Sequence, residues 1–382
     1  MCKNKIKAAV VGGGFIGKQH IEAIRRIPNA EVVAIVETTI ERAKTIAEQY
    51  HIPNYYDNED ELFALEGIDV IHVCTPNFLH YEMAKKALEH DMNVFCEKPL
   101  SLSAEQSQAL VDIASMSTGL HAVNLNYRSN VMVREMREQV INKKIGNLLL
   151  VQASYIQDWL MYDTDYDWHF VPDMVGASRA VADIGSHAFD LIQFISGQKI
   201  TDVFADLIKV YPKRKESKEE RETFSEVVSD NYEEVAVQNE DAAFIIAKLE
   251  DGTKVSITIS QVTGGHKNDI EVCMSGSKQS ITWKQEHADR LYIGKRNRGN
   301  ELLYADAKYV SDKAKRFIAL PNGHAVGWAD AFKNSIQEFY LAIEDKDNKE
   351  LDYVDFYKGH YLMKLIEACI ESNKTQTWIH VK

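Results

Sequence analysis

A carboxylate and an imidazole lie four residues apart in the stretch VADIGSHAFDL, as Asp183 and His187. If this stretch is helical, the spacing places both side chains on one face of the helix. A nearby carboxylate raises the basicity of a histidine and helps to orient its ring. Because histidine titrates near neutrality, the pair is a candidate for general acid–base catalysis. Taken alone, the residues favour a helix histidine with no catalytic task as the interpretation of His187.

The same spacing of Asp and His is compatible with a metal site. However, the sequence offers no other cluster of His, Asp and Glu that would complete a set of ligands. We therefore expect no bound metal ion.

Three glycines follow the first apolar run, in VVGGGFIGKQH, and form the pattern G-x-G-x-x-G at Gly12, Gly14 and Gly17. The pattern is weak alone, but here it follows a predicted strand, opens a predicted helix and precedes Glu37 by 20 residues. This context is typical of a dinucleotide-binding turn, with a glycine-rich turn that binds nothing as the alternative. Glu37 would accept hydrogen bonds from the adenosine ribose and repel a 2′-phosphate, which favours NAD over NADP. Arg42 could soften that preference, although a place on the helix surface is the simpler interpretation.

The first third of the chain alternates short apolar runs with amphipathic helical patterns. This alternation predicts a parallel sheet that is covered on both faces. The expected strands are residues 7–11, 31–36, 69–74, 93–96 and 120–124, and the expected helices are residues 17–26, 40–50, 59–65, 81–89 and 104–115.

From about residue 147 onward, strand-like runs follow one another, which favours an antiparallel sheet. These runs are residues 147–158, 201–210, 242–249, 253–261, 270–275 and 279–283, and helical patterns at 329–343 and 356–372 close the chain. We therefore expect two domains, residues 1–125 and residues 126–382. The charged run KRKESKEER, residues 213–221, predicts an exposed loop or a flexible insertion between two strands.

The run NVFCEKPLS, residues 93–101, ends a predicted strand with Glu97, Lys98 and Pro99. Taken alone, it is a solvated exit from a strand, in which the proline holds the preceding residue extended. Its place at the carboxyl edge of a parallel sheet, where dinucleotides bind, makes Lys98 a candidate for contact with reacting groups.

Composition excludes several classes of protein. The chain has 382 residues, 45% of them hydrophobic and 26% charged, which is enough for two domains with cores of their own. Its formal net charge of −13 argues against a nucleic-acid partner. Five cysteines without a CxxC pair indicate reduced thiols, and no run approaches the ~18 apolar residues of a membrane span. We therefore expect a cytoplasmic protein with no membrane contact.

Four stretches together resemble the Gfo/Idh/MocA oxidoreductases, which act on sugars, polyols and related compounds: GGGFIGKQH, CTPNFLHYEMAKKAL, CEKP and DIGSHAFDL. The resemblance covers nearly the whole chain, in the family's order. It implies an N-terminal Rossmann domain and a C-terminal α/β domain with a large, mostly antiparallel open sheet. Because that sheet commonly serves as an oligomer interface in the family, the resemblance also implies a homodimer or homotetramer.

The resemblance assigns roles to individual residues. It implies His187 as the general acid/base, Asp183 as the residue that orients it, and Lys98 as the donor that stabilises charge on the reacting oxygen. For His80, the alternative is a helix N-terminal residue satisfied by backbone groups. In the family the Lys98–Pro99 peptide is often cis. The implied cofactor contacts are Gly12, Gly14, Phe15, Ile16, Gly17, Glu37, Thr75, Pro76, Asn77, His80, Glu97, Lys98 and Asn126.

Substrate contacts are less specific in the sequence. Aromatic side chains beside carboxylates, as in QDWLMYDTDYDWHF, suit a carbohydrate, although an aromatic-rich loop packed at a domain interface is the alternative. Many family members have Trp-Arg where this chain has Trp168 and His169, and the consequence of Arg179 for substrate choice is open. His324 has packing at a helix N-terminus as its alternative. The expected substrate contacts are Lys98, Arg128, Asp158, Trp159, Trp168, Asp183, His187 and His324.

The sequence thus predicts an NAD-dependent oxidoreductase that transfers hydride between nicotinamide and a secondary alcohol of a sugar, polyol or inositol-like substrate. One alternative is a glycoside-processing enzyme of the same family that uses transient oxidation. Another is a non-catalytic dinucleotide-binding regulator, against which the retention of Lys98, Asp183 and His187 argues.

Overall fold

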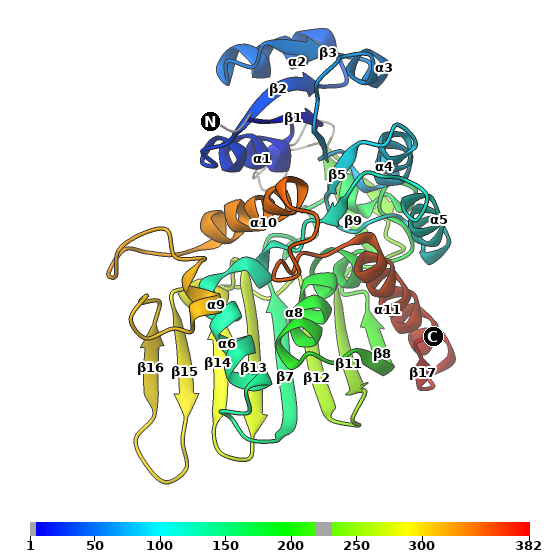
Figure 1. Ribbon diagram of the computed structural model, residues 1–382. Helices are drawn as coiled ribbons and strands as arrows, with labels where there is room; N and C mark the ends of the chain where they lie inside the picture. The colour runs from blue at the N-terminus through cyan, green and yellow to red at the C-terminus, as the bar shows by residue number, and fades with distance from the viewer. Residues whose placement is uncertain (1–4, 218–230) are drawn as a thin grey trace. The chain divides into compact units, whose positions relative to one another are not determined.

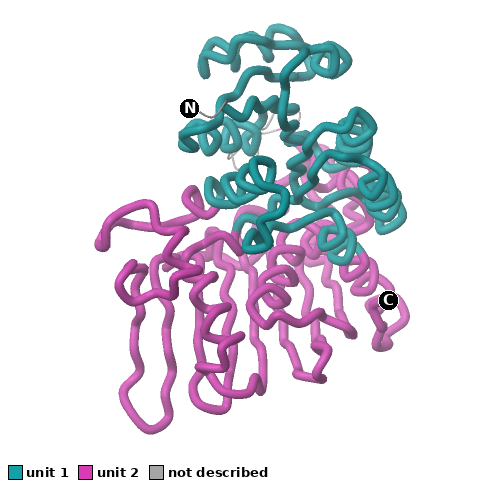
Figure 2. Tube along the Cα trace, viewed as in Figure 1, with its two compact units in different colours: residues 1–126, 332–363 teal, residues 127–331, 364–382 magenta. Residues whose placement is uncertain are grey.

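The computed structural model describes residues 5–217 and 231–382 (Figure 1). The chain forms two compact units (Figure 2). Unit 1 comprises Met1–Asn126 and Phe332–Met363, and unit 2 comprises Tyr127–Ala331 and Lys364–Lys382. The division into domains of residues 1–125 and 126–382 stays a prediction.

Unit 1 contains a six-stranded sheet in the order β3-β2-β1-β4-β5-β6, in which every neighbouring pair is parallel. This confirms the parallel sheet expected from the alternation of strands and helices. The strand order reverses between β1 and β4, so the carboxyl ends of these strands flank the point where open α/β sheets bind ligands. The strands are β1 Ile6–Val11, β2 Ala30–Val36, β3 Asn54–Tyr56, β4 Val70–Val73, β5 Asn93–Cys96 and β6 His121–Val123.

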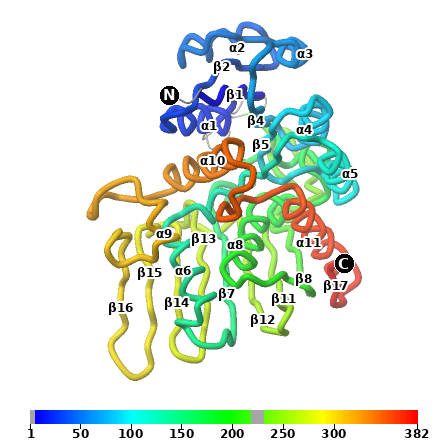
Figure 3. Tube along the Cα trace, in the orientation of Figure 1, coloured from blue at the N-terminus to red at the C-terminus, as the bar shows by residue number. Residues whose placement is uncertain are grey.

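Helices follow the strands of unit 1 in sequence. In Figure 3, the orange helix α10 lies beside the blue helix α1. The ring of Phe332 on α10 packs on that of His20 on α1, with 4.9 Å between the ring centroids. The C-terminal part of the chain therefore contributes to this unit. The helices are α1 Phe15–Arg25, α2 Ile40–Gln49, α3 Glu59–Phe63, α4 His80–Glu89, α5 Ala104–Ala114 and most of α10 Trp328–Glu344.

Unit 2 contains a nine-stranded sheet in the order β16-β15-β14-β13-β7-β12-β11-β8-β17. Only β12 and β7 pair in parallel, so the expectation of a mostly antiparallel open sheet is confirmed. The strands are β7 Leu148–Ile156, β8 Ile200–Ile208, β11 Ala242–Leu249, β12 Lys254–Ser260, β13 Asp269–Gly276, β14 Ser280–Lys284, β15 Arg290–Gly294, β16 Glu301–Tyr304 and β17 Ile379–His380.

One face of this sheet carries helices α6 (Val131–Ile141) and α8 (Ser186–Ser196), as Figure 1 shows. On the strands, residues alternate between the two faces, so buried Ile245 lies between the exposed side chains of Phe244 and Ile246. The exposed apolar residues on these strands include Leu149, Phe244, Ile246, Tyr292, Leu302 and Tyr304. The remaining helices are α7 Pro172–Val175, α9 Asp312–Lys315 and α11 Phe356–Thr375, which is shared between the units.

The prediction of a loop at residues 213–221 is wrong for its first part. Strand β9 (Lys213–Ser217) pairs with β10 (Tyr232–Ala236) as an antiparallel hairpin, whereas residues 218–221 lie outside the described residues. Burial alternates along β9: exposed Lys213 pairs with Glu234 and half-buried Lys215 pairs with Asp163, while Arg214 between them is fully buried. The run has the period of a strand, which its high charge density concealed.

None of the helices in the described part of the chain combines the length and apolar character that a bilayer span requires. Among the same residues, no group of three or more His, Cys, Asp and Glu side chains is arranged to hold a metal ion.

Candidate functional site

In the glycine turn after β1, the backbone is closely packed at Gly12 and Gly17 and open at Gly14. Gly12 has a positive φ of 92°, and a Cβ there would lie 2.7 Å from the Cys74 carbonyl oxygen. A Cβ at Gly17 would lie 1.9 Å from the carbonyl oxygen of Gly12, so α1 can pack this close only with glycine. A Cβ at Gly14 would meet nothing within 4 Å, and Gly14 caps α1 without a side chain. Open space at an uncapped helix N-terminus fits the pyrophosphate of a dinucleotide.

Glu37 follows β2 and is held rigidly. Its carboxylate accepts hydrogen bonds from the backbone N–H of Gly13 at 2.7 Å and of Thr38 at 2.9 Å. Arg42 Nε lies 3.3 Å from Glu37 Oε2, although the Arg42 side chain is 62% exposed. The carboxylate is thus fixed beside the glycine turn, where an NAD ribose would need an acceptor. Arg42 pairs with it and is more than a helix-surface residue.

Among the buried polar atoms of unit 1 that have no hydrogen-bond partner within the described residues, two belong to predicted cofactor contacts. They are the hydroxyl oxygen of Thr75, just after β4, and the side-chain nitrogen of Asn126. A buried polar atom without a partner is costly, so both positions suit contact with a polar ligand. The fit supports the predicted cofactor contacts on this edge of the sheet.

His80 connects two of the predicted cofactor segments. Its Nδ1 lies 2.7 Å from the Pro99 carbonyl oxygen, and its Nε2 lies 2.9 Å from that of Thr75. Burial lowers the pKa of His80, and the two carbonyl groups oppose that shift only in part. Both ring nitrogens thus contact backbone groups, as expected if His80 only closes the N-terminus of its helix. A direct contact between His80 and the cofactor stays a prediction. Phe15 is exposed, whereas Ile16, Pro76 and Asn77 are half-buried.

The segment after β5 carries the predicted lysine. The Lys98–Pro99 peptide bond is cis, as the family resemblance implies, and the side chain of Lys98 is half-buried. Glu97 beside it is buried and accepts hydrogen bonds from His20 Nε2 at 2.9 Å and Asn124 Nδ2 at 2.6 Å. Burial by itself raises the pKa of Glu97, but these hydrogen bonds outweigh it and bring the pKa below its usual value.

A buried chain of hydrogen bonds continues from Glu97 through unit 1. His20 Nδ1 lies 2.7 Å from His72 Nδ1, and His72 Nε2 lies 2.7 Å from the hydroxyl of Tyr340. Burial and the neighbouring His20 lower the pKa of His72 well below its usual value, so this ring is neutral. Because His72 is neutral, one of its ring nitrogens donates and the other accepts, and His20 Nε2 donates to the Glu97 carboxylate at the end of the chain. Sequence reasoning missed this chain because His72 is hidden inside β4.

In unit 2, Asp183 and His187 lie in one continuous helical segment, as their spacing predicts. Asp183 belongs to a π-helical turn, Val181–Gly185, that runs directly into α8, which contains His187. Single π-helical turns are frequent at functional sites because they re-aim side chains. His187 is only 6% exposed, and the ring of Tyr127 packs edge-on against it with 4.8 Å between centroids.

Two tyrosines beside His187 share a hydrogen-bond cluster that the sequence did not reveal. The hydroxyls of Tyr127 and Tyr155 lie 2.8 Å apart, Tyr155 donates to Asn268 Oδ1 at 2.5 Å, and Tyr127 accepts from Asn268 Nδ2 at 3.0 Å. Burial raises the pKa of Tyr127 to about 12 and that of Tyr155 well above its usual value, and the charge of Asp183 adds to both shifts. Both phenols therefore keep their protons near neutral pH, which leaves His187 as the group suited to exchange one.

The aromatic and acidic segment after β7 has half-buried side chains. Asp158 forms an ion pair with Lys267 at 2.7 Å and accepts from the Gly265 N–H, while Trp159 donates to Gln157 at 3.0 Å. The ring of Trp168 stacks on His169 at 3.7 Å, and His169 Nδ1 lies 2.9 Å from Asp167. The segment thus brings an indole face, an imidazole and carboxylates together, as sugar binding would require.

Two other predicted substrate residues have structural partners. The buried guanidinium of Arg128 forms a two-point ion pair with buried Asp190. His324 is exposed, and its Nδ1 lies 2.9 Å from the Pro321 carbonyl oxygen. Substrate contact by either residue stays a prediction.

The sequence matches two family models. Residues 6–125 match the model described as "Oxidoreductase family, NAD-binding Rossmann fold", and residues 133–282 match "GFO/IDH/MocA C-terminal domain". Together these matches span more than two thirds of the chain. The protein therefore belongs to the Gfo/Idh/MocA oxidoreductases, and unit 1 contains the NAD-binding Rossmann fold of that family.

Individual relatives resemble the chain over nearly its whole length. A levoglucosan dehydrogenase from Pseudarthrobacter phenanthrenivorans is 24% identical over 401 residues, which cover 98% of each chain. A glucose-6-phosphate 3-dehydrogenase from Bacillus subtilis is 23% identical, with 96% of each chain covered. A solved structure of levoglucosan dehydrogenase with NADH and L-sorbose superposes with a TM-score of 0.88 at 23% identity, covering 100% of both chains. At this identity, the structural likeness shows the fold alone.

Proposed function

We propose that the protein catalyses NAD-dependent hydride transfer at a secondary alcohol of a sugar, polyol or inositol-like substrate. The observation that carries this proposal is the buried Asp183–His187 segment, in a chain that also has the glycine turn and the fixed Glu37 carboxylate. A pure dinucleotide sensor has no need of an acid–base pair, and no metal-binding cluster within the described residues offers different chemistry.

The chain's own residues divide the work of the reaction. His187 takes the hydroxyl proton as the alcohol is oxidised and returns it in the reverse direction. Asp183 orients the imidazole and favours its protonated form as the proton arrives. Lys98 donates a hydrogen bond to the reacting oxygen and stabilises its developing negative charge. Bound NAD supplies the hydride acceptor.

NAD is the preferred cofactor in this proposal. The N-terminus of α1 at Gly14 receives the pyrophosphate, and Glu37 accepts from the adenosine ribose. The Thr75 hydroxyl and the Asn126 amide, whose buried atoms have no partner within the described chain, complete their hydrogen bonds with the cofactor.

The substrate is a neutral cyclic polyol. Trp159 and Trp168 offer apolar ring faces for C–H groups, and Asp158 offers a carboxylate for hydroxyls. His169 is tied to Asp167, so this position supplies no free arginine-like cation for a phosphate. The relatives named above, a levoglucosan dehydrogenase and a glucose-6-phosphate 3-dehydrogenase, support a sugar substrate, and the first of these names is that of a neutral sugar.

We further propose a homodimer or homotetramer that associates through the exposed face of the nine-stranded sheet. Exposed apolar side chains on this sheet, among them Phe244, Ile246, Tyr292 and Leu302, support an interface there. Four cysteines of the described chain, Cys74, Cys96, Cys273 and Cys369, are free thiols, which is consistent with a cytoplasmic location.

The test is the absorbance at 340 nm when NAD is mixed with a panel of sugars, polyols and inositols. We expect NADH formation with at least one neutral member and a drop in kcat of at least ~100-fold for His187→Ala, with NAD affinity nearly unchanged. Near wild-type turnover of His187→Ala would remove the acid–base assignment. Product formed without net NADH would point to transient oxidation, and NAD binding with no turnover across the panel would point to a regulator.

A further inference from the structure

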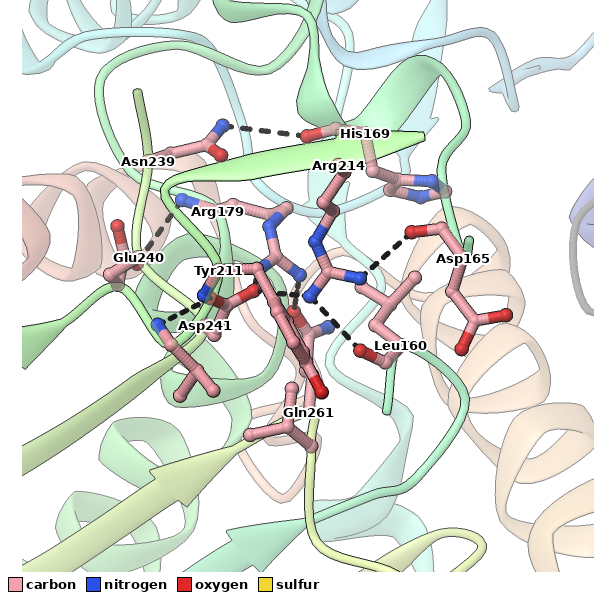
Figure 4. A network of polar contacts seen from close by, with 12 residues as sticks. Leu160, Asp165, His169, Arg179, Tyr211, Arg214, Asn239, Glu240, Asp241 and Gln261 are labelled. Carbon is pink, nitrogen blue, oxygen red and sulfur yellow. Dashed lines mark hydrogen bonds and ion pairs between the residues drawn. The ribbon is translucent and has the colours of Figure 1, made fainter. Parts of the chain in front are cut away.

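Gln261, directly after β12, forms hydrogen bonds with both Asp183 and the buried Arg179, and Figure 4 shows it beside Arg179. The side chain is fully buried. Its amide nitrogen Nε2 donates to Asp183 Oδ2 at 2.8 Å, and its amide oxygen Oε1 accepts from Arg179 Nη1 at 2.5 Å. No sequence pattern singled out this glutamine, and Arg179 had no assigned role.

Arg179 fixes which way the amide of Gln261 points. A guanidinium has only donors, so the atom of Gln261 that faces Arg179 must be the oxygen. The amide NH₂ group is then left to face Asp183, and it can only donate. A carboxylate that accepts such a hydrogen bond is stabilised in its ionised form. Arg179 thus favours ionised Asp183 without touching it.

Arg179 is itself held firmly. Its Nη2 lies 2.5 Å from Asp241 Oδ1, and its guanidinium carbon lies 4.2 Å from the centre of the Phe170 ring. Burial lowers the pKa of Arg179, and the charge of Asp241 opposes that shift. Figure 4 shows Arg214 converging on the same carboxylate, at 2.7 Å from Asp241 Oδ1. The two N–H groups of Val210 and Tyr211 satisfy the other oxygen of Asp241.

The backbone that leads into the π-helical turn is fixed by the neighbouring acid. Glu240 Oε1 accepts from the Ser178 hydroxyl at 2.7 Å and from the backbone N–H of Arg179 and Val181 at 3.1 and 2.9 Å. Adjacent acids therefore hold the Arg179 side chain and its main chain separately. A buried ionic cluster adds little net stability compared with apolar packing, so fixing an orientation is a better physical reason for it.

We propose that Gln261 is a positioning residue for the Asp183–His187 pair, with its amide oriented by Arg179. This inference rests on the proposed function, because it concerns how Asp183 serves His187 in the same reaction. Gln261 touches neither the reacting atoms nor the cofactor in this account; it acts through Asp183.

The first test removes the amide at nearly constant volume. Gln261→Met is expected to lower kcat by about 10- to 100-fold with little change in KM, because the misplaced pair acts in the chemical step. The matched control is Gln139→Met. Gln139 is also buried, and its Nε2 donates to the Glu135 carboxylate at 3.0 Å, on helix α6. Equal losses of kcat in the two variants, or none in Gln261→Met, would overturn the proposal.

The second test places a carboxyl group beside Asp183. Two carboxylates at one buried site cannot both ionise easily, and any extra charge favours protonation of His187. The acid limb of kcat/KM for alcohol oxidation should therefore move to higher pH by about one unit or more in Gln261→Glu. Gln139→Glu makes the same change next to Glu135 and should leave the limb in place. An unmoved limb in Gln261→Glu would contradict the proposal.

The third test separates orientation of the amide from general stability. Arg179→Lys retains a donor towards Gln261 and should preserve most of kcat, whereas Arg179→Met leaves the amide free to turn and should lower it. Because Arg179 acts through Gln261, the double variant Arg179→Met/Gln261→Met should lose no more kcat than Gln261→Met alone. Additive losses in the double variant would refute the orienting role.

A readout without turnover distinguishes failure of this inference from failure of the proposed function. The His187 ring can be titrated by NMR, with its signals assigned by their loss in His187→Gln. If no substrate on the panel is oxidised, the proposed function fails, and the titration alone decides the inference. A higher apparent pKa for protonation of the pair in Gln261→Glu supports it, and a titration identical to wild type overturns it.

Discussion

The preference for NAD over NADP rests on the carboxylate of Glu37. Replacing that carboxylate with an amide should reverse the preference. Glu37→Gln keeps the shape of the side chain and an oxygen for the Gly13 N–H, which lies 2.7 Å away in the wild type. The new NH₂ group would then face the Thr38 N–H and Arg42, both of which are donors. Arg42 loses its partner and becomes available for a 2′-phosphate.

The expected size of the effect follows from Coulomb's law. Two unit charges 4 Å apart near a protein surface repel by about 4 kcal/mol, and the open solvent beside Arg42 reduces this to about 2–4 kcal/mol for a 2′-phosphate near Glu37. Removing the charge should therefore tighten NADP binding by about 30- to 1,000-fold. NAD should bind about 10- to 150-fold more weakly, because hydrogen bonds to a charged acceptor are worth about 1.5–3 kcal/mol.

The assay is the dissociation constant of NADH and NADPH, measured by fluorescence titration at two salt concentrations. Glu41→Gln makes the same charge change at an exposed position on α2 and should leave the ratio of the two constants unchanged. The double variant Glu37→Gln/Arg42→Gln should lose part of the NADPH gain. The reasoning is refuted if Glu37→Gln does not tighten NADPH binding, or if the double variant retains the whole gain.

Three further outcomes follow from buried and exposed groups. Tyr340→Phe leaves Nε2 of His72 buried without its hydrogen-bond partner and should lower the free energy of unfolding by about 1–3 kcal/mol. Tyr353→Phe, in a half-buried ring packed on Phe339, is the control in urea denaturation, and equal losses would contradict the argument. Because the pKa of His72 lies well below 6.5, the unfolded chain binds a proton that the folded chain does not. Stability should thus fall by about 1.4 kcal/mol per pH unit below about pH 6.5, a slope that His72→Gln should lose. On the exposed sheet face, Phe244→Asp should shift the oligomer towards monomer in light scattering, and an unchanged mass would exclude that face as the interface.

The alternation of apolar runs and helical patterns predicted most elements of unit 1 closely. Strand β5 coincides with the predicted run, and α2 begins at the predicted residue. The short strand β3, Asn54–Tyr56, was missed because three residues at a sheet edge carry too little periodicity. Strands β15 and β16 were missed for a related reason: they pair near the other sheet's edge, where the alternation is weak.

The sequence could also predict which residue types carry the chemistry, since Gly12, Glu37, Asp183 and His187 lie in recognisable local patterns. It could not predict their supports. Gln261 reaches Asp183 across 78 residues of chain, and nothing near Gln261 marks it. Arg214 belongs to the charged run of residues 213–221, and the density of charge in that run predicted an exposed loop. Contacts of this range are set by the register of strands, which local patterns do not report.

The two buried networks share a direction. In unit 1, a hydrogen-bonded chain runs from Tyr340 through His72 to His20, and His20 donates to the carboxylate of Glu97, next to Lys98. In unit 2, a donor-only guanidinium fixes an amide that donates to Asp183. Each network therefore ends on a carboxylate and supplies it with hydrogens, which favours the ionised form. A residue that must remain charged in a partly dry site needs such fixed donors, because water that would otherwise solvate it is excluded. In the proposed reaction, these buried donors would keep Glu97 beside Lys98, and Asp183 of the Asp183–His187 pair, ionised.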